Sequence, residues 1–185
     1  MTNSMTTDPP PIVHHLHDDG VVPNNGSLPL VILPKGLPDA CRRDPDKVLA
    51  LFAANRWIGG WINGIYAFQH YHSNAHEVLG IAAGEARVQF GGPNGPVLEV
   101  AAGDVVVIPA GVAHCRVSNP EGLVVVGAYP AGQADVDLCR DSTSEREKAL
   151  QRIPLVPLPD TDPIGGESGG LTVAWSLARS RGNRI

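Results

Sequence analysis

The chain has 185 residues, 43% of them hydrophobic and 18% charged, with a formal net charge of −5 from fourteen basic and nineteen acidic residues. This length fits one domain, and the apolar content is enough for a packed core, which argues against a disordered chain. No basic stripe runs through the middle of the chain, which argues against a nucleic-acid partner. No apolar run approaches the roughly 20 residues of a membrane helix, and the polar start does not resemble a secretory signal. The expected location is the cytoplasm, away from any membrane.

Residues 1–27 are rich in Pro, Asp, Asn and Gly, which indicates an N-terminal arm and not a core element. The arm holds His14, His15 and His17. A His-rich segment can bind metal, but these three have no carboxylate at a fixed spacing, so a solvated or docked segment is the favoured interpretation.

The next segments predict one strand and one helix. Residues 28–33 form a short apolar run before Pro34, which is typical of a strand. Residues 45–56 place apolar side chains at helical spacing, with Asp44 as the N-cap before Pro45.

From residue 57 to residue 130, short apolar stretches alternate with Gly, Pro and Asn breaks, which predicts an all-β domain that is closed or sandwiched. Residues 105–108 and 123–126 are uninterrupted and β-branched, as in strands buried on both faces. Residues 142–153 predict a helix capped by Ser142 or Thr143, and the prolines after it favour an extended segment that wraps the surface. We therefore expect one domain over 28–177, with a motif core at 57–130. The basic tail at 178–185 contains Arg179, Arg181 and Arg184.

Four potential metal ligands lie in two segments bounded by glycine. His70 and His72 are two residues apart, so on a strand both side chains point to the same face. Glu77 follows after a short loop, and His114 comes three residues after Gly111 in a second segment. Imidazole and carboxylate together suit iron, manganese, nickel, cobalt, copper or zinc. The sequence thus predicts one divalent transition metal ion, without distinguishing among these elements.

The spacing of these residues resembles the two motifs of the cupin superfamily. The first reads Gly64, five residues, His70-x-His72, four residues, Glu77, six residues, Gly84. The second reads Gly103, five residues, Pro109-x-Gly111, two residues, His114, and departs from the family pattern only at Ser118, where the superfamily has Asn. Further runs, such as 23–25, 76–80 and 127–130, resemble the small bacterial YjlB-like cupins over nearly the whole chain.

This resemblance implies a single double-stranded β-helix, that is, an RmlC-like jelly-roll barrel, with the arm and short helices at its flanks. It implies that His70, His72, Glu77 and His114 are the metal ligands, and that the protein pairs as a homodimer. Four ligands around a metal that prefers five or six leave positions open for a small molecule.

Strand alternation adds candidate residues around the metal. Tyr66 and Phe68 should share the inward side with His70 and form a wall of the substrate pocket. Arg116 should share the inward side with His114, where it either binds a substrate carboxylate or phosphate, or lies at the rim paired with an acid. His76 could donate a hydrogen bond to a metal ligand, serve as a proton shuttle near the mouth, or be a surface loop residue.

Trp57 and Trp61 could line a pocket, although core packing is the more common use of tryptophan.

Three functions fit these expectations. Within the resemblance, a metal-dependent oxidoreductase of the dioxygenase kind acting on a small organic molecule is favoured, with a decarboxylase or isomerase on the same barrel as variants. The second function is a non-catalytic module that binds a metal or small ligand. The third, a metal-free sugar-nucleotide epimerase or isomerase, conflicts with the presence of all four ligands. An open pocket at the ligands would favour the enzyme, and a plugged one the binding module.

Overall fold

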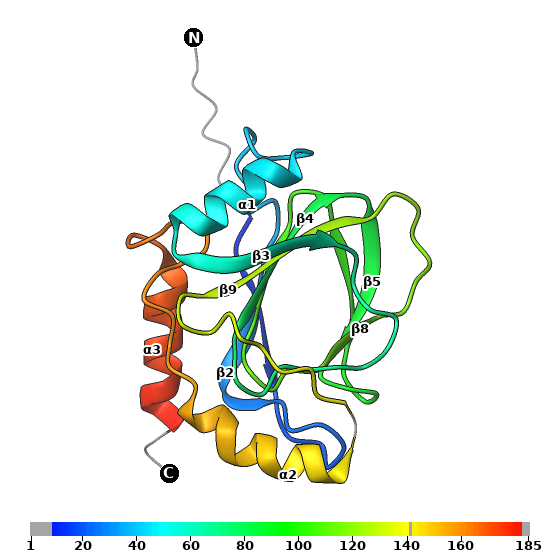
Figure 1. Ribbon diagram of the computed structural model, residues 1–185, viewed down its shortest axis with the longest axis vertical. Coiled ribbons are helices and arrows are strands. Elements are labelled where there is room, and N and C mark those ends of the chain that lie inside the picture. The colour runs from blue at the N-terminus through cyan, green and yellow to red at the C-terminus, as the bar shows by residue number, and fades with distance from the viewer. Residues whose placement is uncertain (1–8, 141, 183–185) are drawn as a thin grey trace.

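The computed structural model describes residues 9–140 and 142–182, in which two antiparallel sheets form a barrel with helices on its outside (Figure 1). The strands are β1 (Ile12–Leu16), β2 (Asn25–Leu33), β3 (Trp57–Asn63), β4 (Glu77–Ala83), β5 (Glu85–Phe90), β6 (Val97–Ala101), β7 (Val105–Ile108), β8 (His114–Arg116) and β9 (Val124–Pro130). The helices are α1 (Pro45–Ala54), α2 (Thr143–Arg152), a 3-10 turn over Ile153–Leu155, and α3 (Gly170–Gly182).

The larger sheet has the strand order β1-β2-β7-β4-β9-β3, and the smaller has the order β6-β5-β8. Helices α1 and α3 lie outside the larger sheet, while β5 and β8 form the opposite wall of the barrel (Figure 1). The predicted all-β jelly roll with short flanking helices is confirmed.

Two apolar layers explain why the central strand β7 has a hydrophobic residue at every position. In β7, Val106 and Ile108 face the layer inside the barrel, whereas Val105 and Val107 face the layer between the larger sheet and the helices. Because successive strand side chains point to opposite faces, a strand covered on both sides must be apolar throughout. The prediction of doubly buried strands is confirmed for β7, whose four residues are all buried.

The helices α1 and α2 begin where their capping residues predict. Asp44 accepts a hydrogen bond from the backbone N–H of Lys47, and Ser142 accepts one from that of Glu145. Each cap satisfies a backbone donor that the first helical turn leaves free. The outward face of the larger sheet then holds α1 in place through the buried side chains Val48 and Phe52.

The two ends of the described chain differ from the sequence prediction. Part of the expected arm forms β1, which pairs with β2 as an edge strand of the larger sheet. After the Pro-rich segment the chain forms a helix that the sequence did not predict, α3, which buries Leu171 and Trp175 against the sheet. Arg179 belongs to this helix and donates to the carbonyl of Val156 (2.9 Å), while Arg184 lies outside the described residues.

The exposure of most of its residues hid β1 from the sequence pattern, because only its last residue is buried. Within the described ranges, no helix is long and apolar enough to cross a membrane.

Candidate metal centre

Backbone pairing brings the histidines of the two motifs together. His70 and His114 form an antiparallel bridge, with N–H to carbonyl distances of 3.3 Å and 2.9 Å. His72 follows two residues later, while Tyr71 between them points the other way and pairs with Cys139. The alternation of side-chain direction that the sequence predicts therefore holds from His70 to His72, although these residues form isolated bridges and not a long strand.

A tight turn at Gly111 sets the approach to His114. The backbone N–H of Gly111 donates to the carbonyl of His72 (2.8 Å), and its φ of +90° is a conformation that side chains disfavour. A Cβ at this position would lie 2.4 Å from the carbonyl oxygen of Asn24. Asn25 in turn donates from its side-chain amide to the carbonyl of Ala110 (2.9 Å). Asn24 and Asn25 thus hold the turn that places His114 in the second motif.

Glu77 is the first residue of β4 and lies opposite Ile108 of β7. Its side chain shares a face with Leu79 and Ile81, which belong to the layer inside the barrel. The sheet therefore aims this carboxylate into the barrel, where it is 2% exposed.

Each of the three histidines is fixed by the same kind of contact. In every ring, Nδ1 lies at a backbone carbonyl oxygen, so it carries the proton and donates it there. The Nε2 atoms are left with a free lone pair, which is the form that binds a metal. The carbonyl partners of His70, His72 and His114 are those of Phe68 (3.2 Å), Asp137 and Val112 (3.4 Å), respectively.

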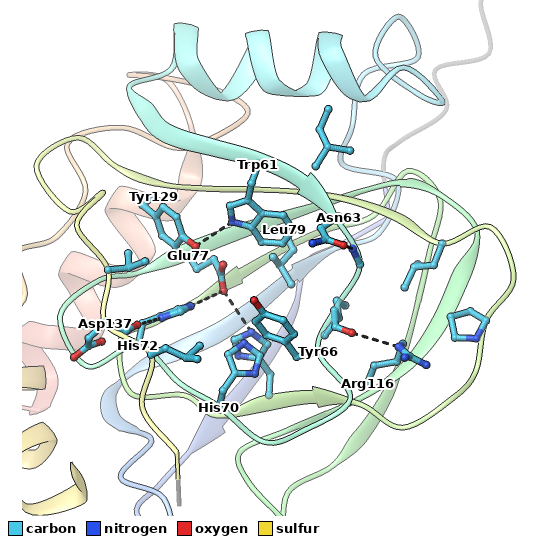
Figure 2. Close-up of a pocket in the computed structure, with 18 of the residues that line it drawn as sticks. Trp61, Asn63, Tyr66, His70, His72, Glu77, Leu79, Arg116, Tyr129 and Asp137 are labelled. Carbon is cyan, nitrogen blue, oxygen red and sulfur yellow. Dashed lines mark hydrogen bonds and ion pairs between the residues drawn. The ribbon is translucent and has the colours of Figure 1, made fainter.

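The Nε2 atoms of His72 and His114 converge on one oxygen of Glu77. Oε2 lies 3.6 Å from the first and 3.4 Å from the second (Figure 2). Burial acts to raise the pKa of Glu77, but a proton shared with the rings of His114 and His72 outweighs it and holds the pKa well below its usual range; the same contact, working against burial, raises the pKa of His72. Burial, together with the charge of His114, lowers the pKa of His70 to about 3, so this imidazole is neutral near pH 7.

The arrangement of Glu77 and the histidines suits a bound cation better than direct contact among these side chains. Oε2 of Glu77 is buried and makes no regular hydrogen bond with the described residues, which is costly for a carboxylate. Two imidazole lone pairs aimed at an anion also repel it unless a positive charge lies between them. Across the described chain, however, no three His, Cys, Asp or Glu side chains already stand as a complete metal cluster. The four predicted ligands lie near one another, and they would have to move closer together to coordinate one metal ion.

A cavity of about 930 Å³ opens beside these four side chains, all of which line it. The remaining lining is apolar and aromatic with a few polar side chains, Asn63, Asn119 and Asp137, and Arg116 is the one arginine among the described lining residues. Arg116 donates from Nε to the carbonyl of Ile65 (3.3 Å) and from Nη1 to Asn119 (3.1 Å) and to the carbonyl of Ser118.

The alternative interpretation of Arg116, a rim residue paired with an acid, does not match these contacts. Within the described ranges its side chain takes part in no ion pair, and it faces Glu77 across the cavity (Figure 2). Cys115, its neighbour, is buried outside the cavity lining, as strand alternation predicts.

Only one of the two predicted aromatic wall residues lines the cavity. Tyr66 does, whereas Phe68 stacks on it at 4.7 Å between ring centroids and lies beneath the guanidinium of Arg140. The segment before His70 is not a regular strand, so the strict alternation that the prediction assumed does not apply there.

His76 lies neither near the mouth of the cavity nor at the surface, the two positions that the sequence predicts for it. His76 is fully buried outside the cavity lining, and its Nδ1 accepts a hydrogen bond from the backbone N–H of Ala110 (2.9 Å). Its ring packs on Trp175 of α3 at 4.8 Å between centroids. Burial, together with the charge of Arg179, lowers the pKa of His76 to about 3. A neutral ring without solvent access has a structural role.

Tyr129 and Asp137 belong to the site although their own sequence neighbourhood did not single them out, and Trp61 takes the pocket role that the sequence left open for it. Trp61 and Tyr129 line the cavity, and Trp57, by contrast, is a core residue that donates to the carbonyl of Thr161 (3.0 Å). Asp137 supplies the carbonyl for His72, while its carboxylate accepts from the backbone N–H of Ser73 (2.7 Å). The spacing of these residues carries no motif, because their positions depend on how distant segments pair.

Comparison with known proteins supports the family that the motifs resemble. The cupin family model matches residues 63–146. The uncharacterized protein YjlB of Bacillus subtilis (strain 168) is 37% identical over 158 residues, which cover 85% of this chain and 92% of that protein.

Among solved structures, acireductone dioxygenase from Bacillus anthracis with a cadmium ion in its active centre has a TM-score of 0.38 and 12% identity, over 56% of this chain and 79% of that one. The coconut allergen cocosin has a TM-score of 0.36 and 17% identity over 44% of this chain, which spans only 22% of the length of cocosin. Likenesses of this size carry no argument about activity. The two motifs, the barrel they lie in, and the identity to YjlB over nearly all of both chains together show that this chain belongs to the cupin family.

Proposed function

We propose that this chain is a metal-dependent enzyme that holds one divalent transition metal ion through His70, His72, Glu77 and His114. The observation that carries the proposal is the orientation of the histidines. Backbone carbonyls take all three Nδ1 protons, so the Nε2 lone pairs are left for a ligand inside the barrel. The buried Oε2 of Glu77 supplies the negative charge that such a site needs.

A bound metal with these four ligands would supply Lewis-acid or oxygen-activating chemistry. The side chains of the chain itself supply the rest. Glu77 reduces the net charge of the centre, and the carbonyl contacts of the histidines keep their rings in the correct tautomer. The apolar walls around Leu79 and Leu123 limit access of water to the ligands.

The cavity favours an enzyme over a metal-storing module, because it is open at the ligands and not plugged by side chains. Its volume of about 930 Å³ is in the range of small-molecule pockets. Arg116 lies across the cavity from Glu77, and its Nη2 is engaged in none of the described hydrogen bonds. A planar guanidinium in that position suits a carboxylate. We therefore propose a small organic acid as the substrate, with one end at the metal and the other at Arg116.

For the reaction class we propose a dioxygenase-like oxidoreductase. The support is the ligand set itself, since imidazole and carboxylate ligands with open positions suit oxygen chemistry at iron and its neighbours. A decarboxylation or an isomerisation of the same class of substrate is the alternative reaction.

The experiment is elemental analysis of protein purified without chelator, for wild type, His72→Ala and His17→Ala. His17 is an exposed histidine outside the cavity, so its variant controls for adventitious binding. We expect about one equivalent of transition metal in wild type and His17→Ala, and loss of it in His72→Ala. Absence of metal from wild type after reconstitution, or equal metal in His72→Ala, would refute the site.

Oxygen uptake of the loaded protein is then measured with small aromatic acids, dicarboxylates and diketones. For a compound that is turned over, we expect Arg116→Gln to raise KM far more for the acid than for its methyl ester. An equal effect on both would show that Arg116 does not bind the carboxylate.

A further inference from the structure

Tyr129 lies directly opposite the metal-site carboxylate in the larger sheet. Strands β4 and β9 are antiparallel, with Val78 opposite Ala128 and Leu79 opposite Gly127. The same register places Glu77 opposite Tyr129. Side chains opposite each other on one face of a sheet are neighbours, with Cβ atoms about 5 Å apart. Both side chains line the cavity, and Figure 2 shows the tyrosine hydroxyl beside the carboxylate.

Trp61 determines where the proton of this hydroxyl points. The indole Nε1–H donates to the oxygen of Tyr129 at 3.0 Å. An indole nitrogen can only donate, so the hydroxyl is the acceptor in this contact and must direct its own proton elsewhere. Beside it lies the carboxylate of Glu77, a group that can only accept (Figure 2).

Gly127 makes this arrangement possible. Trp61 is paired with Gly127 across β3 and β9, and a Cβ on that glycine would lie 2.1 Å from carbons of the indole ring. The ring therefore lies across β9 at the one residue without a side chain. This contact brings its N–H to Tyr129, two residues further along the same strand.

We infer that Tyr129 is a positioning residue for Glu77, and that Trp61, seated on Gly127, holds it in the donating orientation. The hydroxyl would retain one oxygen of the carboxylate and leave the other for the cation. This inference rests on the proposed function. Hydrogen-bond partners of metal ligands typically contribute about 10- to 100-fold in metal affinity, which sets the size of the expected effect.

The test uses Co²⁺ as the probe, titrated into full-length metal-free protein by calorimetry and followed by its visible ligand-field absorption. We expect Tyr129→Phe to weaken Co²⁺ binding by about tenfold or more and to change the absorption spectrum, because the carboxylate is no longer held. Trp61→Phe should act in the same direction with a smaller effect. Gly127→Ala should do so too, although it removes no polar group.

Tyr71→Phe is the matched control, since it removes a hydroxyl from a buried tyrosine that points away from the cavity. It should leave both the affinity and the spectrum unchanged. Thermal melts of the metal-free proteins establish that each variant is folded, and the Tyr129 and Trp61 variants decide the matter if Gly127→Ala does not fold.

The outcomes separate the two proposals. No Co²⁺ binding by folded wild-type protein would refute the proposed metal site. Binding by wild type that is abolished in His72→Ala but unchanged in affinity and spectrum in Tyr129→Phe would keep the metal site and overturn the positioning role.

Discussion

Replacement of Trp175 by alanine should destabilise the protein more than almost any other single change in the helices. Trp175 lies on α3, is 0% exposed, and belongs to the apolar layer between the larger sheet and the helices. Its indole N–H donates to the carbonyl of Pro29 in β2 at 3.1 Å, and its ring covers His76. The side chain thus joins α3 to β2 and to the segment that leads into Glu77.

The magnitude follows from the burial of the whole ring. Truncation of a buried tryptophan to alanine costs about 3–5 kcal/mol, because the apolar contacts are lost and a cavity remains. The carbonyl of Pro29 also loses its partner. For a domain whose free energy of unfolding is typically about 5–15 kcal/mol, this is a large fraction of the total. Trp175→Phe keeps most of the apolar volume and should lose about 1–3 kcal/mol, largely through the unpaired carbonyl.

The assay is urea denaturation of the metal-free proteins followed by far-ultraviolet circular dichroism. Leu177→Ala is the matched control, because Leu177 lies on the same helix and is 56% exposed. We expect it to change the free energy of unfolding by no more than about 0.5 kcal/mol. If Trp175→Ala cost less than about 1 kcal/mol, or no more than Leu177→Ala, the packing of α3 on the sheet described here would be refuted.

Three other predictions concern the caps, the support of the site and the thiols. Asp44→Ala should lower the free energy of unfolding by about 1 kcal/mol, measured by the same denaturation, because the first turn of α1 loses its cap. An unchanged value would show that the cap contributes nothing. Asp137→Ala should weaken Co²⁺ binding by about tenfold, because the carboxylate that ties its backbone to Ser73 is lost and the carbonyl at His72 loosens; an unchanged dissociation constant would contradict this. Burial and the charge of Asp137 raise the pKa of Cys139 to about 11, so at pH 8 this thiol is protonated and should be alkylated far more slowly than half-buried Cys41. Its rate should climb only as the pH approaches 11, and mass-spectrometric mapping that found equal rates at pH 8 would count against it.

Much of the fold and of the site follows from local patterns in the sequence. The strand β7 was predictable because β-branched residues at every position fit only a strand covered on both faces. Asp44 and Ser142 mark helix starts because a capping side chain satisfies donors within its own turn. His70 and His72 were predictable as a pair, since a spacing of two fixes a common face on any extended segment. Each of these inferences depends on interactions between residues near in sequence.

The prediction failed where the local pattern was weak or irregular. Strand β1 shows little apolar periodicity because its residues are largely exposed, and only pairing with β2 defines it. Alternation misplaced Phe68 because the segment before His70 is not a regular strand.

Other features were decided only by the tertiary structure. His76 is next to Glu77 in sequence, yet it is buried beneath α3. The residue that packs on its ring, Trp175, is remote along the chain. Tyr129 and Glu77 are likewise far apart in sequence, and the register of β4 and β9 alone makes them neighbours. The sequence by itself therefore determined which side chains are candidate metal ligands, because ligand chemistry and strand period are local properties. Which residues support those ligands was decided by sheet pairing and helix packing, because these depend on the burial of apolar surface from segments remote along the chain.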